Sequence, residues 1–584
     1  MLGLFLTTSR APAFANEVWP PGLAAAHDAV KGVFPAETLA GCCWMGTGAV
    51  MRFARPLADT VVLRIGIPSY AAAPGGTLVV FRVNDMPGQT RCCYGPGEHD
   101  LAFTLGRGVR GSPITVRIRA SPEFVPAERG IGPDRRRLTI LIRSLRAFDP
   151  NDRFQKLDGE GGASPRNLIV VLAGGIAAAI GARKRSAIAW AALLASAPFS
   201  FAYAVGGTTL TLPKLILLGA VAGTASRRDV RAAIGDLGAV RWIVVPFVAF
   251  LLSMSLSDGV AVAHGAALRE TLKAAEYALT FALAFLAYRM EADDVLASRV
   301  VAGVASLVAL LALAQLAFGA AQWTLIAGHT VPRIAGPLEG PNQLAAFLGL
   351  ALPVLAVRAL ARRPSLPELA GFVLASLALV GSISRSGIIA AAFAVVIFLI
   401  LRREPSALRK TLVVFSFVWV VIAAAAVAGA RGVGAFARLF GGNDDAYAGG
   451  LGNRVELWRG ALALWRAHPW LGVGPGNYEV HIGELIPGVA THANGYYLHV
   501  LAEQGLLGAC AFLALTGGTI AVLARGIARP LTLGVFAAVL GLTAHQLVDG
   551  IFIYPKVGVF AWALIGIAAA KSRDGGRIAE GKTA

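Results

Sequence analysis

The sequence predicts an all-α polytopic membrane protein with about 13 transmembrane helices, preceded by a small N-terminal β-sandwich domain. Three observations support this fold class. The 584-residue chain is 56% hydrophobic and only 15% charged, and its mean hydropathy is +0.64. Hydrophobic segments of membrane-crossing length follow one another from residue 167 onwards. The first 148 residues show short alternating runs instead.

The net charge of +19 at pH 7, from 53 basic and 34 acidic residues, raises the question of a nucleic-acid ligand. The sequence shows no helix, ribbon or finger motif that would present those charges to a duplex. In an apolar chain, Lys and Arg gather in cytoplasmic loops, where they set the orientation during membrane insertion. We therefore expect a lipid bilayer as a partner and no nucleic acid.

We predict that residues 1–148 form an extracytoplasmic β-sandwich accessory domain. Its short apolar runs, separated by Gly, Pro and Asp, are 60–65, 77–82, 114–118 and 138–143. The segment 126–148 resembles β-sandwich modules that accompany some bacterial glycan enzymes, through Asp134, Arg136 and Leu138. This resemblance implies a domain that faces carbohydrate, and a purely structural domain is the alternative.

Four of the five Cys residues fall in this domain as two adjacent pairs, Cys42–Cys43 and Cys92–Cys93. Two disulfides across the sandwich would suit an oxidising compartment. The spacing does not match a zinc site with two Cys-x-x-Cys halves, so a metal is the weaker interpretation. The fifth residue, Cys510, lies in an apolar run and is expected to pack within a helix.

A polar stretch rich in Gly, at 149–166, predicts a linker. We predict that residues 167–571 form the membrane domain, with a large periplasmic loop at 431–495, and that residues 572–584 form a cytoplasmic tail. The expected spans are 167–182, 186–204, 210–225, 240–257, 271–289, 299–318, 341–358, 366–382, 386–401, 411–430, 496–523, 530–547 and 553–570.

The loop charges predict the orientation of these spans. On one side of the membrane every predicted connection is basic, whereas the connections 205–209 and 548–552 on the other side carry no Lys or Arg. The positive-inside rule then places the β domain and the large loop outside the cytoplasm, and the C-terminal tail inside it. The oxidising compartment suggested by the paired cysteines agrees with this orientation.

Unusual polar residues collect on the predicted outer face. Arg333, Glu339 and Asn342 lie near a membrane boundary, and Arg385 lies between two spans. A basic residue at mid-membrane costs about 2.5–3.5 kcal/mol on insertion scales, and less near the surface. A short outer loop whose Arg reaches the headgroups is the simplest interpretation. An anionic ligand is favoured because Arg454 also falls on an outer segment.

Within the large loop, Asn453 followed by Glu456 predicts an N-cap for a helix over 454–467. The apolar stripe of this helix is expected to pack on the bundle or on the membrane surface, and consists of Trp458, Leu462 and Trp465. Residues 468–478 follow as a Gly-rich turn whose backbone donors would suit phosphate oxygens.

His492 lies just before a helix that re-enters the membrane. A lone His is more often structural than catalytic, but Asn494, Tyr496 and Tyr497 beside it favour a polar pocket. An ordinary imidazole pKa of about 6.5 suits proton transfer near neutral pH.

The order of these motifs resembles the O-antigen ligase and O-antigen polymerase superfamily of membrane glycosyltransferases. The resemblance spans 167–570 and is strongest around 453–508. The motifs that carry it are Arg333, Gly336, Pro341 and Asn342; Ser-Arg-Ser-Gly at 384–387; Asn453, Arg454 and Trp458; His-Pro-Trp-Leu-Gly-Val-Gly at 468–474; and His492, Asn494, Tyr497, Leu498, Ala502, Glu503 and Gly505–Gly508.

The resemblance implies a GT-C-like enzyme that takes a glycan from undecaprenyl diphosphate without a metal or cofactor. The implied catalytic residues are Arg385, Arg454 and His492, with the arginines on the diphosphate and His492 on the acceptor hydroxyl. Further residues expected to bind the diphosphate or substrate are Arg333, Asn342, Asn494 and Tyr496. Ala493 departs from the His-Asn pair that is frequent in the family, and His499 is an alternative base.

The resemblance therefore implies a multi-pass enzyme of the bacterial inner membrane, with its active site on the periplasmic side. Ligation of the glycan onto lipid A core, as in lipopolysaccharide biosynthesis, is the leading reaction. Polymerisation of O-antigen or exopolysaccharide repeat units on the carrier is the alternative. A transporter of lipid-linked sugars is disfavoured because the ionisable groups gather on one face. An inactive glycan-binding scaffold is the fourth possibility.

Overall fold

The computed structural model describes the following parts of the chain: 17–19, 30–33, 43–53, 60–69, 71–84, 87–104, 114–129, 135–148, 165–199, 201–205, 208–291, 294–317, 322–326, 329–361, 364, 366–402, 451–485 and 492–571. Several predictions fall outside these residues: Cys42, Asp134, most of the linker, the span at 411–430, two parts of the large loop and the C-terminal tail.

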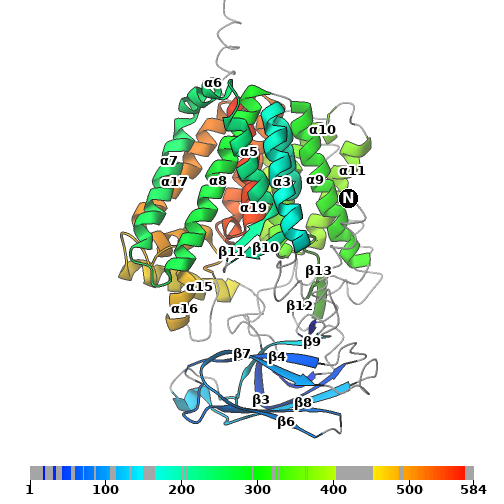
Figure 1. Cartoon of the computed structure of the whole chain (residues 1–584), viewed down its shortest axis with the longest axis vertical. Helices are drawn as coiled ribbons and strands as arrows, with labels where there is room; N and C mark the ends of the chain where they lie inside the picture. Colours follow the sequence, from blue (N-terminus) through cyan, green and yellow to red (C-terminus); the bar gives the residue numbers. More distant parts are fainter. Residues whose placement is uncertain are drawn as a thin grey trace, which may run out of the picture.

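Helices make up most of the described chain (Figure 1). The longer ones are α3 (Pro165–Lys184), α4 (Ser186–Ser196), α5 (Leu212–Ala225), α7 (Arg241–Asp258), α8 (His264–Met290), α9 (Asp294–Ala317), α10 (Pro341–Ala359), α11 (Leu366–Gly381), α12 (Arg385–Arg402), α15 (Leu451–Ala467), α17 (Tyr496–Ala524), α18 (Pro530–His545) and α19 (Pro555–Lys571). The shorter ones are α6 (Val230–Gly235), α16 (Tyr478–Leu485) and the 3-10 turns η4 (Pro126–Arg129), η6 (Asp236–Val240) and η7 (Ile551–Ile553).

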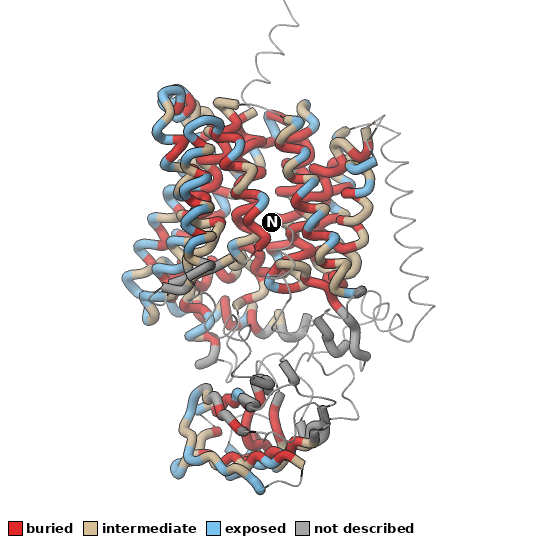
Figure 2. Tube along the Cα trace, turned by 45° about the vertical axis from the view of Figure 1, so that its right-hand side comes forward, coloured by how far each residue is buried: buried red, intermediate tan, exposed pale blue. Residues whose placement is uncertain are grey.

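Apolar residues cover both the inside and the outside of the helical bundle. Within the described residues, five helical segments are long and apolar enough to cross a membrane: Val230–Asp258, Asp294–Leu316, Pro341–Ala359, Arg385–Arg402 and Tyr496–Ala524. The outer face of α7 exposes Val245, Val248, Leu252 and Leu256, whereas its inner face is buried. Figure 2 shows the same contrast between the buried interior and exposed outer helices. A helix that is apolar on all sides is expected in a bilayer.

The structure supports a multi-pass membrane protein but does not confirm thirteen spans. The prediction of a span over 186–204 is wrong beyond Ser196, where α4 ends after 11 residues. The chain continues into an antiparallel hairpin of β10 (Ala202–Val205) and β11 (Thr208–Thr211). Hydropathy does not distinguish an apolar hairpin from the end of an apolar helix, and the predicted boundary fails for that reason.

Helix α19 occupies the centre of the bundle, with every residue from Val557 to Ala570 buried. Aromatic side chains of neighbouring helices pack around it: Phe347 of α10 lies 4.1 Å from Phe560, and Phe247 of α7 lies 4.6 Å from Trp562, between ring centroids. The small residue Gly558 allows the ring of Tyr277 on α8 to approach the α19 backbone closely. The core therefore forms around the last described helix.

The N-terminal part of the chain is rich in antiparallel strands. Its strands are β1 (Glu17–Trp19), β2 (Val30–Val33), β3 (Cys43–Phe53), β4 (Thr60–Ile67), β5 (Thr77–Val83), β6 (Gln89–Tyr94), β7 (Gly97–Thr104), β8 (Ile114–Ser121) and β9 (Leu141–Phe148). Their hydrogen-bonded order is β6-β5-β8-β3-β9-β4-β7. Phe81 of β5 nevertheless stacks on Phe103 of β7, with ring centroids 4.1 Å apart. Strands far apart in that order therefore face each other across one core.

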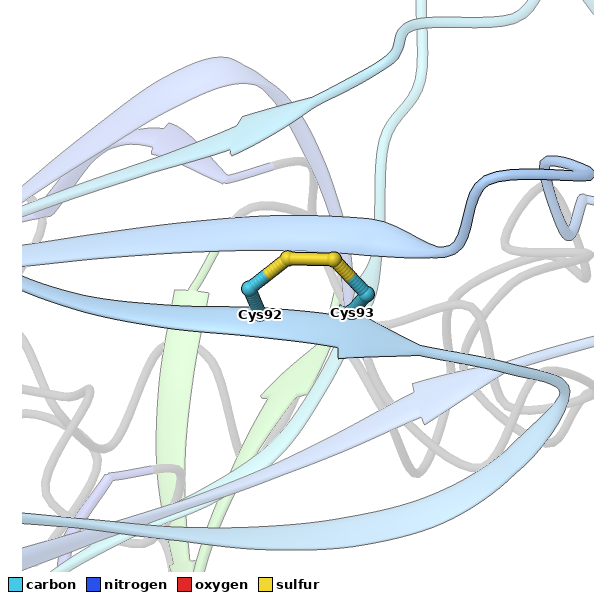
Figure 3. Close-up of a disulfide and its surroundings, with 2 residues drawn as sticks. All are labelled: Cys92 and Cys93. Carbon is cyan, nitrogen blue, oxygen red and sulfur yellow. A yellow bond between two sulfur atoms is a disulfide. The ribbon is translucent and has the colours of Figure 1, made fainter.

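The disulfide in this domain is not the one expected. The prediction placed two disulfides across the sandwich, but the described bond joins the neighbours Cys92 and Cys93 on β6 (Figure 3). Both residues are exposed at the edge of the sheet. Spacing alone cannot separate a bond between two adjacent pairs from a bond within one pair, and the expected bridge across the sandwich is wrong for Cys92 and Cys93.

Helix α17 is broken at Gly505, whose backbone has φ 61° and ψ −158°. The break leaves the carbonyls of Ala502 and Glu503 without their helical donors. The backbone N–H groups of Val473 and Gly474 donate to these carbonyls at 3.0 and 2.8 Å. In return, the N–H groups of Leu506 and Leu507 donate to the carbonyls of Pro469 and Trp470.

The segment 469–474, which we call the strap, therefore replaces the hydrogen bonds that the break in α17 removes. This finding corrects the expectation that the Gly-rich turn offers backbone donors to phosphate, because the donors of Val473 and Gly474 are already satisfied by α17. Gly472 is required in the strap: its φ is +66°, and a Cβ atom there would lie 2.3 Å from the carbonyl carbon of Glu503.

We expect Gly472→Ala to lower the thermal stability of the purified protein clearly, because a left-handed Ala costs about 1–2 kcal/mol before any clash is counted. The matched control is Gly517→Ala on α17, where an added Cβ meets nothing within 4 Å. Heating followed by size-exclusion chromatography measures both. Equal melting temperatures for the two variants would contradict the role given to the strap.

Candidate functional site

A chain of polar contacts begins at Arg333, where strand β13 (His329–Arg333) ends after pairing with β12 (Gln322–Ile326). Arg333 is only 8% exposed. Its Nε donates to the carbonyl of Ser382 at 2.9 Å, and its Nη2 donates to Oδ1 of Asn342 at 2.9 Å. Asn342 in turn donates from Nδ2 to Oδ2 of Asp549 at 2.9 Å. Two predicted site residues, Arg333 and Asn342, are thus in direct contact.

Asp549 is the residue that the sequence analysis missed. It follows α18, is 2% exposed, and accepts hydrogen bonds from Asn342 and from the backbone N–H of Gly550. Nε2 of His545 lies 4.0 Å from its Oδ2. An acidic residue between two apolar spans is itself a signal of function, since charged groups are costly at that depth. We noted the connection 548–552 only for its lack of basic residues.

Arg454 reaches this carboxylate from α15. Its Nη1 donates to the carbonyl of Val548, the residue before Asp549. Burial lowers the pKa of Arg454 below its usual value; the charge of Asp549 opposes this shift, and the positive charge of Arg385 adds to it. These effects require both Asp549 and Arg385 to lie near the guanidinium group. The structure therefore brings together Arg385 and Arg454, which are separated by 69 positions in the sequence.

Arg385 is the first residue of α12, after the turn that follows α11. The turn is fixed by the buried hydroxyls of Ser382 and Ser384: Ser382 accepts from the N–H of Ser384 at 3.2 Å, and Ser384 accepts from the N–H of Gly387 at 3.4 Å. The absence of a side chain at Gly387 lets Ala345 of α10 approach, since a Cβ atom there would lie 2.3 Å from its Cβ; Cε1 of His545 lies 3.4 Å from the same position. Arg385 is half-buried beside this contact.

His492 lies in the short segment that precedes α17. Its ring meets Tyr554 edge-on, with centroids 5.9 Å apart, and a Cβ atom at Gly550 would lie 3.0 Å from its Cδ2. Burial lowers the pKa of His492; Asp549 and Glu479 act in the opposite direction, and nearby positive charges add to the lowering. The imidazole is therefore neutral at pH 7, with one nitrogen able to accept a proton.

The other predicted residues around His492 have mainly packing contacts in the structure. The carbonyl of Asn494, at a residue with φ 49°, accepts a hydrogen bond from Nε1 of Trp458 at 3.1 Å. The ring of Tyr496 contacts Phe512 and Phe552 edge-on. Substrate binding by Asn494 and Tyr496 stays a prediction.

His499, the alternative base, lies inside α17, as expected. Its Nε2 is 3.4 Å from Oε2 of Glu503, and both side chains are buried. Glu503 also accepts a hydrogen bond from the backbone N–H of Tyr478 at 3.0 Å. This arrangement fixes the start of α16 against α17. Glu503 thereby gives His499 a structural partner within α17.

Further polar groups border the site without having been predicted. Nζ of Lys273 donates to the carbonyl of Ile553 at 2.9 Å, and Nζ of Lys556 donates to that of Pro337 at 2.6 Å. Burial, together with nearby carboxylates, raises the pKa of Tyr554 to about 12. Its phenol is thus a hydrogen-bond donor at neutral pH. Within the described ranges, no group of three or more His, Cys, Asp or Glu side chains is placed to hold a metal.

The helix prediction within the large loop is partly correct. Helix α15 ends at Ala467, as expected, but its described residues begin at Leu451, so Asn453 lies inside the helix instead of capping it. The buried stripe consists of Leu457, Ala461 and Leu464, one position before each of the predicted residues. This shift turns Trp458 towards Asn494 and Arg454 towards Val548.

The comparison with known families supports the expected relationship. Residues 370–513 match the family described as O-Antigen ligase. The match includes Arg385, Arg454 and His492, whereas Arg333, Asn342 and Asp549 lie outside it. No curated protein matches the chain. The O-antigen ligase resemblance drawn from the motifs is thereby confirmed for the segment that contains the three predicted catalytic residues.

We expect Asn342 and Asp549 to be energetically coupled, because removing either one leaves a buried polar partner unsatisfied. In a double-mutant cycle of Asn342→Ala and Asp549→Ala, the interaction energy should be about 0.5–3 kcal/mol. Unfolding in mixed detergent micelles measures it. The control cycle pairs Asn342→Ala with Asp236→Ala, since Asp236 pairs with Arg289 instead. An additive first cycle would refute the contact.

Proposed function

We propose that this multi-pass membrane protein, whose residues 370–513 form an O-antigen ligase domain, joins a glycan from undecaprenyl diphosphate to an acceptor hydroxyl. The family match supports a membrane glycosyltransferase that acts on lipid-linked glycans. The observation that carries the finer proposal is the convergence of Arg385 and Arg454 beside Asp549 and a neutral His492. Arginines that meet in a buried site are suited to a diphosphate.

In the proposed reaction, the acceptor oxygen attacks the anomeric carbon of the donor glycan. The bond between that carbon and the diphosphate oxygen breaks, and the carrier leaves as undecaprenyl diphosphate. Arg385 and Arg454 stabilise the negative charge that develops on the leaving group. They are suited to this role because Arg454 is buried near a second cation, and both effects lower its pKa. An anionic ligand would stabilise the charged guanidinium groups.

His492 takes the proton of the acceptor hydroxyl in this proposal. Its burial keeps the imidazole neutral, and Asp549 limits how far its pKa falls. The resulting imidazolium would face the carboxylate of Asp549, which attracts it. Asp549 also holds Asn342, and through it Arg333, in place at the edge of the site. We therefore assign Asp549 a positioning and electrostatic role.

The proposed orientation places the site on the periplasmic face of the bacterial inner membrane. The strand domain lies at the same end of the bundle as α15 and α16, whereas α6 lies at the opposite end (Figure 1). Basic residues lie in connections or in last helical turns at the α6 end, including Arg227, Arg289 and Arg402. This distribution agrees with the positive-inside rule. The strand domain would then lie on the same side of the membrane as the glycan. It would either bind the glycan or have a purely structural role.

Ligation to lipid A core is the leading reaction, and repeat-unit polymerisation is the second. Both need the same donor site, so the arginines proposed for the diphosphate do not distinguish the two reactions. The test is to incubate the purified protein with lipid-linked oligosaccharide and either lipid A core or a second lipid-linked repeat unit. Glycan on lipid A core indicates ligation, and a longer chain on the carrier indicates polymerisation. Movement of the carrier across vesicles without a new glycosidic bond would instead indicate a transporter.

We expect Arg385→Ala and Arg454→Ala each to lower kcat/KM for glycan transfer by about 10²–10³-fold, as the loss of one charge-stabilising donor does elsewhere. Arg459→Ala is the control, because Arg459 is an exposed residue on the same helix α15 as Arg454. Product formation on the acceptor measures all three. Transfer that persists in the first two variants would show that these arginines do not stabilise the leaving group.

The pH dependence of transfer should report the state of His492. If the neutral imidazole is the base, kcat/KM rises with pH through the pKa of His492, which lies below its ordinary value near 6.5, and is level above it. Asp549 raises that pKa, so Asp549→Asn should move the rising limb to lower pH, whatever its effect on the maximal rate. Rate profiles of both proteins give the comparison. A limb that moves to higher pH would exclude His492 as the base.

A further inference from the structure

A cavity lies at the end of the bundle opposite the candidate site. It has a volume of about 640 Å³ and lies among α5, α6 and α8 (Figure 1). Arg227, Arg228 and Arg231 form its rim. Its walls are apolar and include Leu279, Leu283 and Leu286 of α8. A cationic rim above an apolar interior matches an amphiphile with a negative headgroup.

The rim carries an excess of positive charge. Arg227 is fixed by Asp229 and Glu291, and Arg185 also lies 3.7 Å from Glu291. Arg228 and Arg231 also line the cavity, so four arginines accompany these two carboxylates and leave a net charge of +2. Arg228 and Arg231 are exposed.

Glu291 is held in turn by the start of α4, because it accepts hydrogen bonds from the backbone N–H groups of Ser186 and Ala187. The ion pairs of Arg227 thereby anchor the turn between α5 and α6 to α4. Arg228 projects from this anchored turn and Arg231 from the start of α6, so a ligand that binds them needs to order little of the backbone.

A second observation inside the cavity also points to a ligand. The side chain of Thr224 lines the cavity and is 2% exposed, and its hydroxyl has no hydrogen-bond partner among the described residues. A buried hydroxyl without a partner is unfavourable, and a phosphate or glycerol oxygen in the cavity would satisfy it.

The apolar surface continues from the cavity along both helices. Leu279 is 39% exposed and lies in the cavity wall. Leu272 is 60% exposed and lies two turns before it on α8. On α5, Leu218 is 54% exposed and lies one turn before the cavity residue Val221. These side chains offer a path for an acyl chain away from the arginines. A soluble phosphate compound would use the rim and leave this path unused.

We propose that this cavity binds an anionic membrane phospholipid, with its phosphate at Arg228 and Arg231 and its acyl chains against α5 and α8. The site is separate from the proposed glycan-transfer site and does not depend on it. Its ligand is a lipid of the surrounding bilayer instead of a lipid-linked glycan. The inference concerns binding, and the bound lipid would fix the short helix α6 against the bundle.

The test uses the full chain, stripped of lipid in detergent, and native mass spectrometry with added phosphatidylglycerol. The double variant Arg228→Gln/Arg231→Gln should bind this lipid about tenfold or more weakly, given roughly 1 kcal/mol for each basic residue near a lipid surface. The matched control is Arg299→Gln/Arg525→Gln, which removes two exposed charges from other connections. It should bind as the unaltered protein does.

Two further measurements separate the cavity from its alternatives. Ala282→Trp fills the cavity while keeping the arginines, and it should weaken binding of phosphatidylglycerol as the double variant does. Glycerol 3-phosphate should compete poorly, and phosphatidylcholine should bind more weakly. Equal losses in both double variants would show that general surface charge attracts the lipid. Competition by glycerol 3-phosphate, or equal binding of phosphatidylcholine, would equally overturn the proposal.

Discussion

The organisation of the site depends on the burial of one carboxylate. Asp549 is almost completely shielded from solvent, and a buried charge is tolerated only with donors and opposite charges around it. Asn342 supplies a donor, the backbone of Gly550 supplies another, and Arg454 supplies positive charge nearby. Segments from three parts of the sequence are therefore drawn to one point. The positive charge around Asp549 is larger than the single negative charge of its carboxylate. An additional anion would therefore be held there.

The strap connects this site to the bundle. Helix α17 begins shortly after His492, and its part beyond Gly505 crosses the bundle. Since the strap completes the hydrogen bonds at that break, the position of α15 and α16 is tied to the angle between the two halves of α17. The loop between membrane helices is thus a structural part of the helix it precedes. This explains why Gly472 of the strap lies against backbone atoms of Ala502, Glu503 and Gln504.

The sequence analysis found the features that depend on local composition. Arg385 and Arg454 stood out because charged residues are rare beside apolar spans, and short alternating runs identified the strands β4, β5 and β8. It missed features that depend on contacts across the fold. Asp549 became notable only through Asn342, over 200 positions away, and the partner of the strap is a helix break that periodicity does not reveal. The disulfide between the neighbours Cys92 and Cys93 is local, but the spacing of the cysteines does not distinguish it from a bond between the two pairs.

The central position of α19 has a consequence for biosynthesis. Its residues 557–570 are buried on every side, yet ribosomes make it after all the other described helices. Until this segment enters the bilayer, lipid covers the faces of α8, α10 and α18 that α19 later buries. Insertion of the earlier helices can proceed one by one, but their tight assembly must wait for this final piece. Quality control would therefore see a loose intermediate until α19 is made, and a compact bundle only afterwards.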